Sequence, residues 1–526
     1  MKQKLFFYLY ICVLLGLMSC NEVSKDELVK KEGIQKENVI PPKVSNMVRF
    51  SEILSKAVAK NSDLRSFLKT EALKMMDKDF DIFYPLSKNE IVSNGKSFRD
   101  ILAEYAENKE ELTGIEKTLS LLTIYVPELP SGFDANIWDA ENEIPYVASV
   151  VLRNDSTDFY YDGTVALSIK SSEIPGWPTL VVKNNERIRL KDKNAAPTAL
   201  RSSSNNDAYE FIDEAFDGQS PSLRALLLPP ILPPLVDPPL PPIVPYNPNL
   251  TLQTLYPTQY AAYNEMGLDN NYWQRDYIYY GLTKQSGSTG SGSLNRRFSE
   301  RIVSMEFSPD AYLKMSDQAG DPSWIETLKV SGNPPAGSLF WTEGKFEIKI
   351  DVFFNNLSGL GPTIPIYFSV NPTDIFDVTY SKSDPIMLGL CIYQPTGLKS
   401  KDYNPNIDII TWDLENNSFG WKFNISEIDD QITETQTVTV SAEYATNFGL
   451  TAGGQQEKIG LNFGTSAKRT QTNTYSIATT KGSDDLGSIT YYFSDPVIQS
   501  VSSNNYTLFS RSNPYVKMSI IPVQLY

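Results

Sequence analysis

The chain has 526 residues, of which 41% are hydrophobic and 12% aromatic, so it is long and apolar enough for two or three domains with buried cores. It holds 63 acidic residues against 47 basic ones, which gives a formal net charge of −16. A chain this acidic and without basic runs is not expected to bind nucleic acid.

The residue inventory excludes several catalytic classes. The sequence has no histidine and three cysteines. A Ser-His-Asp or Cys-His nucleophile system and an HExxH metalloprotease site are therefore excluded. Three cysteines cannot supply an ordinary structural zinc site either. Carboxylate, Ser-Lys or Tyr chemistry and oxygen-ligand calcium binding remain. No nucleophile constellation is visible among them, which favours a non-catalytic protein.

Residues 1–19 have the pattern of a signal peptide. Lys2 and Lys4 precede an apolar run from Leu5 to Met18, which is shorter than the about 20 apolar residues of a membrane-spanning helix. The end of the run, Leu17-Met18-Ser19-Cys20, resembles the lipobox of bacterial lipoproteins. The resemblance implies cleavage before Cys20 and acylation of its sulfur, and more than one acyl chain makes such membrane anchoring stable. An ordinary secretory peptide is the alternative.

Residues 20–45 are charged and poor in large apolar side chains, which predicts a flexible, solvated tether. Within them, Lys25-Asp26-Glu27 resembles the acidic surface-export signal of lipoproteins of the Bacteroidota. The resemblance implies an outer-membrane lipoprotein of the cell envelope that is displayed at the surface. A merely charged tether on a protein that faces the periplasm is the alternative.

An α+β domain is predicted for residues 46–190. Apolar residues recur at helical spacing across 50–58 and 64–75, with Ser62 as N-cap of the second segment. Ser97, three residues before Asp100, predicts a capped helix. After about residue 119 the pattern becomes typical of strands, at 121–126, 146–152, 165–169 and 179–182.

Residues 191–250 are predicted to be a linker. Its first part is rich in Ser and Asn, and its second part carries Pro-Pro pairs at 229/230, 233/234, 238/239 and 241/242. Proline fixes φ and lacks an N–H, so this stretch should be a polyproline II spacer of about 3 Å per residue. A docking segment for a partner with an aromatic groove is the alternative.

An all-β, sandwich-like domain is predicted for residues 251–526, because short apolar runs alternate with turn residues. Apolar residues from Phe346 to Phe354 alternate with Glu347, Lys349 and Asp351, which predicts a half-buried strand. The aromatic residues of 272–280 are interpreted as core or cross-strand pairs, with a sugar-stacking platform as the alternative.

Residues 432–477 carry the pattern of a β-hairpin. Apolar residues occupy one parity of the first arm, and Thr or Ser the other; the apolar set includes Val438, Val440, Tyr444, Phe448 and Leu450. The pattern resembles the insertion loops of aerolysin-like pore formers, which implies a membrane-inserting hairpin. A spanning strand needs about 9–11 alternating residues. Polar residues interrupt the apolar parity of the second arm at Arg469, Gln471 and Asn473. An ordinary sandwich hairpin is therefore favoured.

Two groups of acidic residues match parts of known calcium sites. Asp77, Asp79 and Asp81 match the first ligand positions of an EF-hand, but Ile82 replaces the required glycine and Lys88 the required glutamate, so that site is rejected. The second group resembles the calcium-binding loops of C2-type sandwiches and comprises Glu427, Asp429, Asp430, Asp484 and Asp485. This resemblance makes calcium the one candidate cofactor. Solvated turn carboxylates are the alternative.

Stretches of the C-terminal region, such as WDLENNSFGWKFNISEIDD and KIGLNFGTS, resemble uncharacterised exported lipoproteins of the Bacteroidota across about residues 270–500. The resemblance transfers no functional residue. We expect a lipid-anchored envelope protein that acts as a non-catalytic binding or adhesion module for glycan or protein. A pore-forming protein that uses the 432–477 hairpin and a carboxylate-dependent glycosidase are the alternatives, and the sequence nominates no catalytic pair for the latter.

Overall fold

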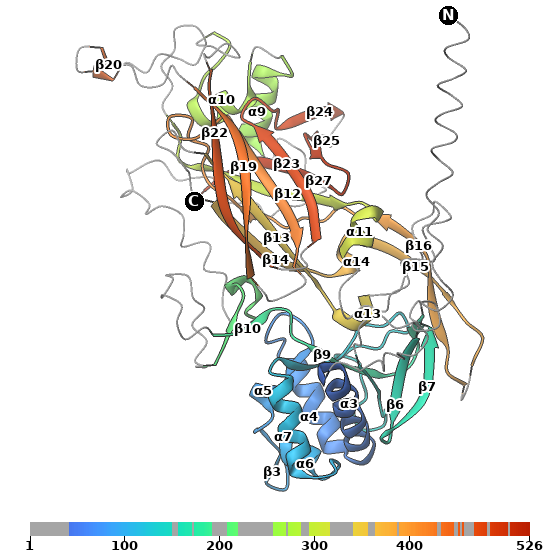
Figure 1. Ribbon diagram of the computed structural model, residues 1–526. Coiled ribbons are helices and arrows are strands. Elements are labelled where there is room, and N and C mark those ends of the chain that lie inside the picture. The colour runs from blue at the N-terminus through green and yellow to red at the C-terminus, as the bar shows by residue number, and fades with distance from the viewer. Residues whose placement is uncertain are drawn as a thin grey trace, which may run out of the picture. The chain divides into compact units, whose positions relative to one another are not determined.

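The structure is a computed structural model, and the first element that it describes is a helix that begins at Pro42 (Figure 1). It describes residues 42–149, 156–170, 173–191, 208–218, 256–269, 272–285, 294–315, 340–355, 363–386, 389–428, 433–445, 451–452, 455–456, 468–480, 484–502 and 505–525. The predicted signal peptide, Cys20, most of the tether and the proline-rich part of the linker lie outside these residues.

The N-terminal region begins with helices, as predicted. They are α3 (Pro42–Lys60), α4 (Ser62–Ala72), α5 (Tyr84–Ser87), α6 (Phe98–Ala103) and α7 (Lys109–Thr118). The capping box of Ser97 and Asp100 at α6 is confirmed. The N-cap of α4 is Asn61 and not Ser62: Asn61 is extended and accepts from the amide of Leu64, so Ser62 falls inside the first turn.

A six-stranded sheet follows, with strand order β1-β4-β9-β5-β6-β7. Its members are β1 (Asp81–Phe83), β4 (Leu122–Tyr125), β9 (Thr179–Asn184), β5 (Tyr146–Ser149), β6 (Ser156–Tyr161) and β7 (Thr164–Lys170). All neighbours are antiparallel except β5 and β9. A small hairpin of β2 (Ile91–Ser93) and β3 (Lys96–Ser97) lies among the helices. Helices and sheet share one apolar core, so the predicted helices and strands of this region are confirmed.

Short elements occur on both sides of the predicted linker. β10 (Ile188–Leu190) pairs with β11 (Tyr209–Phe211), which is followed by a 3₁₀ helix, η1 (Glu214–Phe216). Thus residues 208–218, expected to be linker, fold back on β10. β8 (Ile174–Pro175) joins the sheet of β15 (Phe376–Lys382) and β16 (Ile392–Ser400). The chain from Asn46 to Tyr526 forms one compact unit; the predicted domain boundaries stay predictions.

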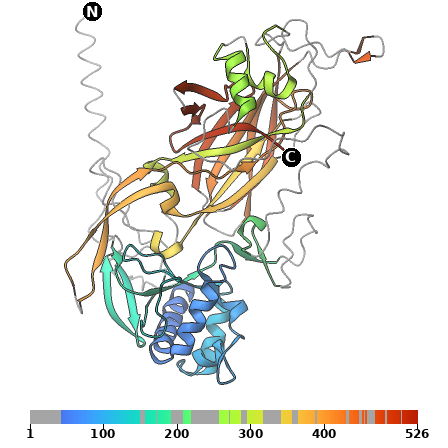
Figure 2. The same ribbon diagram turned by 180° about the vertical axis from the view of Figure 1, so that it is seen from behind.

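Two four-stranded antiparallel sheets enclose the C-terminal core (Figures 1 and 2). One has the order β17-β12-β27-β26 and contains β17 (Ile407–Asp408), β12 (Phe298–Phe307), β27 (Val516–Gln524) and β26 (Arg511–Ser512). The other has the order β14-β13-β18-β23 and contains β14 (Thr363–Val370), β13 (Phe346–Phe353), β18 (Gly420–Glu427) and β23 (Asp484–Tyr492). An α+β region followed by a sandwich-like β region is therefore confirmed.

Three further hairpins occur in the described part of the C-terminal region. β19 (Thr433–Ala445) pairs with β22 (Lys468–Thr480), β20 (Thr451–Ala452) with β21 (Gln455–Gln456), and β24 (Ile498–Ser502) with β25 (Asn505–Leu508). Three short helices, α11 (Pro309–Met315), α13 (Phe340–Glu343) and α14 (Pro372–Ile375), lie between strands. Two further helices, α9 (Pro257–Met266) and α10 (Gln274–Tyr280), lie at one end of the sheets in both views (Figures 1 and 2).

The aromatic residues of 272–280 lie in and just before α10 and not in a strand: Trp273 is the N-cap residue of the helix and Tyr272 precedes it. Trp273, Tyr279 and Tyr280 are buried in the C-terminal core, and Tyr272 and Tyr277 pack against it. The core interpretation of these residues is therefore confirmed, but through a helix. Alternation does not indicate a strand here, because every residue of α10 except Tyr277 is buried.

The prediction of a half-buried strand at 346–354 is wrong in one respect: both faces of β13 are buried. Phe346, Ile348, Ile350 and Val352 face the C-terminal core. On the opposite face, Glu347 and Lys349 are also buried. The charged side chains of this face can be buried because they pair within the protein: Glu347 with Arg187, and Lys349 with Asp351.

Candidate functional site

The structure places part of the predicted acidic group together. Glu427, the last residue of β18, pairs in register with Asp484, the first of β23, and Ser426 pairs with Asp485. Glu427 is fully buried, whereas Asp485 is exposed and accepts from the amide of Gly487. Asp429 and Asp430 lie outside the described residues. Among the residues that are described, no group of three or more acidic or cysteine side chains could hold a metal ion, and calcium binding stays a prediction.

The predicted hairpin is present as a two-stranded ribbon. β19 and β22 pair residue by residue from Thr433↔Thr480 to Ala445↔Lys468, which is 13 pairs. Within the described part of the chain, these two strands form a sheet of their own. Val440 and Tyr475 are buried against Phe353 of β13, and Val438 packs beside them. The side chain of Tyr444 and residues Phe448 and Leu450 lie outside what the structure describes.

Polar groups make up much of the face that the ribbon turns to the sandwich. The amide oxygen of Asn355 accepts from Asn473 Nδ2 (2.9 Å) and from the hydroxyl of Tyr475 (2.6 Å). The register sets Asn473 opposite Val440 and Gln471 opposite Ala442. Because directly opposed residues share a face of an antiparallel ladder, Val440 of β19 has the polar Asn473 of β22 as its neighbour.

A helix is the other kind of element that spans a membrane. No helix that the structure describes is both long and apolar enough to cross a bilayer.

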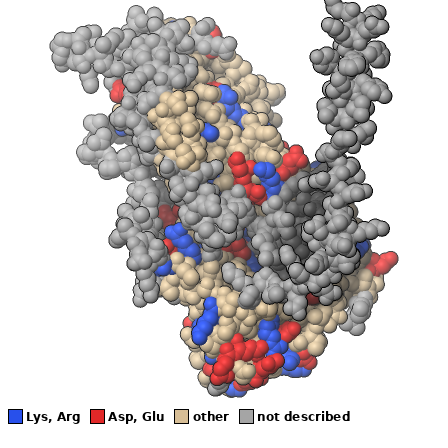
Figure 3. Space-filling model, in the orientation of Figure 1, with Lys and Arg blue, Asp and Glu red and all other residues tan. Residues whose placement is uncertain are grey.

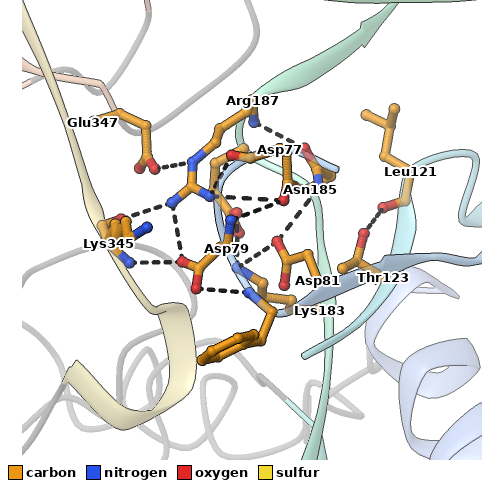
Figure 4. A network of polar contacts seen from close by, with 12 residues as sticks. Asp77, Asp79, Asp81, Leu121, Thr123, Lys183, Asn185, Arg187, Lys345 and Glu347 are labelled. Atoms are coloured by element: carbon orange, nitrogen blue, oxygen red, sulfur yellow. Dashed lines mark hydrogen bonds and ion pairs between the residues drawn. The ribbon is translucent and has the colours of Figure 1, made fainter. Parts of the chain in front are cut away.

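The most strongly charged cluster in the interior is one that the sequence prediction missed (Figure 4). Asp77 and Asp79 precede β1, and Asp81 is its first residue. They stand at every second position and each is buried. Lys78, between the first two, has a positive φ of 69°, so a turn rather than an extended strand brings the three together. The same spacing recurs at the end of β9, where Lys183, Asn185 and Arg187 follow one another at every second position. This second triplet meets the first.

Hydrogen bonds and ion pairs join the two triplets. Asn185 Nδ2 donates to Asp77 Oδ2 (2.7 Å), and Lys183 Nζ lies 3.4 Å from Asp81 Oδ2. Arg187 donates to the backbone oxygen of Asp77 (3.0 Å) and to Asp79 Oδ2 (3.2 Å). Both cationic side chains are buried, so their charges are compensated by neighbours and not by bulk water.

The C-terminal region completes this cluster through the start of β13. Arg187 Nε donates to Glu347 Oε1 (2.5 Å), and the amide of Lys345 donates to Asp79 Oδ2 (3.0 Å). Gly344 has φ +90°, and a Cβ there would lie 2.1 Å from Asp79 Oδ2. A glycine is therefore required at this position, both for its backbone conformation and for the approach of the Asp79 carboxylate.

Burial sets the proton affinities in the cluster. It raises the pKa of Asp81 well above its usual value, although Lys183 opposes the rise. It also raises the pKa of Glu347 to about 7, against the effect of Arg187. The pKa of Asp79 is lowered, because Arg187 and Lys183 outweigh the effect of its burial. The cluster is thus closed and internally paired, which is the arrangement of a connector between chain segments rather than of a substrate site.

A groove on the sheet that contains β12 and β27 is open to a ligand. It holds about 420 Å³, within the range of roughly 300–1,000 Å³ for small-molecule sites. Its floor is formed by Ser304 of β12 and Ser519 of β27, which pair in register where β12 has a bulge after Ile302. Small side chains on the floor leave the hollow that larger ones would fill. We call this feature the β12–β27 groove.

The first wall of the β12–β27 groove is the loop 402–406. The backbone of Tyr403 exchanges two hydrogen bonds of 2.8 Å with Met305 of β12, and its ring stacks on Phe368. Asn406 adopts a positive φ of 52° and donates to the backbone oxygen of Asn404 (3.2 Å). The loop is therefore tied to the sheet beside it.

The second wall is β25, which the buried side chain of Gln274 supports through β24. Gln274 Oε1 accepts from the amides of Val497 and Ile498, both at 2.9 Å, and its Nε2 donates to the oxygen of Ile498 (3.1 Å). At the end of this wall Tyr506 meets Tyr256 edge to face, with ring centroids 6.2 Å apart. Both walls are thus held before any ligand arrives.

The lining of the groove is polar with two aromatic rings. Amide side chains project from both walls: Asn404, Asn406 and Asn505, all exposed. Asp402 is the carboxylate that the described lining contributes. A glycosidase needs two carboxyl groups about 5–9.5 Å apart, so that alternative stays a prediction. Sequence reasoning missed the groove because its lining comes from five separate segments of the chain.

Charges of both signs are interspersed on the visible face of the helices α3 to α7 (Figure 3). Ion pairs account for this mixture, as between Arg49 and Glu111 and between Arg99 and Glu116. The net acidity of the chain is therefore not gathered into one patch on that part of the described surface.

Comparison of the chain with protein-family models, with curated proteins and with solved structures gave no match.

Proposed function

We propose that the protein is a lipid-anchored component of the cell envelope that binds an external ligand, a glycan or a protein, in the β12–β27 groove. The observation that supports this role is the groove itself. Exposed amides and two tyrosines from separate chain segments converge over a floor of two serines. Tyrosine offers a rigid amphipathic contact surface and asparagine adaptable hydrogen bonds, the combination that binding surfaces use repeatedly.

The pre-formed walls add to this support. Gln274 and the Tyr403–Met305 bridge fix the two sides of the groove before binding. A ligand therefore does not need to order these backbones, and less of its interaction energy is lost on association.

Mooring at the membrane is the second half of the proposal. Acylation of Cys20 would hold the body at the outer membrane, since each buried CH₂ contributes about 0.8 kcal/mol and two chains make anchoring stable. The acidic segment after Cys20 favours display at the cell surface. A surface position would present the β12–β27 groove to ligands outside the cell.

The test displays the full chain on a bacterial host and applies these cells to arrays of immobilised glycans and proteins. Cells with the wild-type chain should bind a subset of spots. Tyr506→Ala should weaken this binding, whereas Tyr161→Ala, at an exposed tyrosine of β6, should not. Cys20→Ser should release the protein from the membrane fraction and leave its binding intact. Equal signals from wild-type and Tyr506→Ala cells on every spot would refute the proposal.

A second candidate function is membrane perturbation by the β19–β22 ribbon. Its favouring observation is length: 13 paired residues in each arm exceed the about 9–11 that a spanning strand needs. Against it, Arg469 pairs in register with Tyr444, and an arginine at the bilayer midplane costs about 2–4 kcal/mol.

Release of a dye from liposomes tests this second function. Wild-type protein should cause leakage, and Val440→Asp should prevent it, because Val440 is an apolar residue of the ribbon that would face lipid. Intact vesicles at high concentrations of the wild-type protein would eliminate this function.

A further inference from the structure

The charges around the β12–β27 groove restrict what it can bind. Lys517, the cation in the lining, pairs with Glu306 at 2.8 Å. Asp402 adds an exposed carboxylate. The three groups together carry one net negative charge, on a chain whose formal net charge is −16. An anionic ligand would therefore meet a repulsive field, whereas a neutral ligand would not.

The geometry points to a neutral glycan as the ligand of the β12–β27 groove, with a sugar ring stacked on Tyr256 or Tyr506 and its hydroxyls bonded to the asparagine amides. This inference rests on the proposed binding function and names the ligand class of that same site. Each of its parts follows from the chemistry of the lining.

The two tyrosines supply the apolar part of the contact. Their rings meet at an interplanar angle of 88°, so the edge of one ring lies against a face of the other, and both tyrosines are half-buried in the lining of the groove. A pyranose ring has C–H groups on its faces and hydroxyls around its rim. Such a ring can lie on an aromatic face and keep its hydroxyls free for hydrogen bonds.

The amides supply the polar part. Each asparagine side chain carries two N–H donors and a carbonyl acceptor, so it can satisfy neighbouring sugar hydroxyls, which both donate and accept. Asn404 and Asn406 lie on one wall and Asn505 on the other. A site built to bond hydroxyls discriminates strongly against ligands that lack them, because its own polar groups then lose solvent without compensation.

A peptide fits the same groove less well. Helical and strand ligands anchor through apolar side chains in pockets or along a free sheet edge. In the described lining, Val303 is already buried in the core and Leu508 is half-buried. The floor strands β12 and β27 pair with each other along the groove, through Ser304 and Ser519. The groove therefore offers more hydroxyl-matching groups than apolar anchors.

The experiment uses the full chain in detergent micelles on an array of neutral, uronate-containing, sialylated and sulfated glycans and of immobilised proteins. Binding should concentrate on neutral glycans. Titration with a soluble neutral oligosaccharide from a bound spot should then give an affinity about tenfold weaker for Tyr506→Ala, which corresponds to about 1.4 kcal/mol. Asn505→Asp, an exposed position, should weaken it similarly, and Tyr161→Ala should not change it.

Charge provides a further readout. The affinity should be independent of salt concentration, because no charge recognises a neutral sugar. Binding to anionic glycans that falls with salt, or to proteins only, with Asn505→Asp still impairing it, would overturn the glycan inference and leave the binding function standing. Failure to bind anything on the array would overturn both.

Discussion

Arg187 and Glu347 are 160 positions apart in the chain, yet Arg187 Nε lies 2.5 Å from Glu347 Oε1 in the interior. Both side chains are almost completely buried. The guanidinium also bonds the loop before β1, through the backbone of Asp77 and the carboxylate of Asp79. One cation thus links three chain segments, and the fold depends on its charge being compensated.

Removal of Arg187 should destabilise the protein severely. Arg187→Ala leaves Asp79 and Glu347 buried without their main cation, and breaking a buried ion pair from one side costs about 3–5 kcal/mol. The free energy of unfolding, from urea denaturation, measures this loss. The matched control is Arg301→Ala: Arg301 pairs with Asp408 at the surface, where ion pairs contribute about 0–1 kcal/mol. Equal losses in the two variants would show that the network does not stabilise the fold.

Glu347 should make stability fall as the pH rises through neutrality. Its pKa is raised from 4.5 to about 7 in the folded protein, chiefly by burial. A group that holds its proton more tightly when folded stabilises the fold below its unfolded pKa, and this contribution is lost as the pH approaches 7.

Glu347→Gln isolates this effect from the others. The variant should be less stable overall, because it weakens the contact with Arg187, but its free energy of unfolding should vary less between pH 5 and pH 8. Urea titrations at several pH values give both curves. The prediction does not survive if the two curves are parallel.

Gly344→Ala should be destabilising despite the small size of the change. Gly344 has φ +90°, and the new Cβ would lie 2.1 Å from Asp79 Oδ2. Backbone strain at such a position costs about 1–3 kcal/mol, and displacement of the Asp79 carboxylate adds to it. Gly114→Ala is the control, since a Cβ there meets nothing within 4 Å. A melting temperature of Gly344→Ala that is no lower than that of Gly114→Ala would contradict the close approach.

Asp276→Asn should stabilise the protein at alkaline pH. Asp276 is fully buried, its carboxylate oxygens have no hydrogen-bond partner among the described residues, and burial raises its pKa well above the usual value. Folding therefore favours the neutral acid, and stability is lost as the pH rises above the unfolded pKa. Asparagine carries no such charge. The variant should gain stability over wild type at pH 8 relative to pH 5; a constant difference would argue against a buried neutral acid.

Local patterns predicted the regular elements and failed where distant segments meet. The spacing of apolar residues predicted helix α4 and strand β9, and Ser97 with Asp100 predicted the start of α6. The alternation of polar and apolar residues predicted that the charged face of β13 is exposed to solvent. This prediction is wrong because Arg187 of the N-terminal region covers that face.

The cluster and the groove show the same limit. Asp77, Asp79 and Asp81 match only the start of a local calcium-binding loop. Their contacts are instead with Lys183, Asn185 and Arg187, at the end of β9 and just after it. Two alternating triplets of complementary polarity are a signal that could have predicted this contact. The groove offers no such signal, because no spacing in the sequence relates Tyr256 to Tyr506.

The location of binding is the most direct test of the account. Hydrogen-exchange mass spectrometry on the full chain, with and without a neutral oligosaccharide that it binds on the array, reports which amides gain protection. The account predicts slower exchange in 402–406 and 505–510, the two walls of the β12–β27 groove. Protection confined to other segments, with these two unchanged, would contradict it.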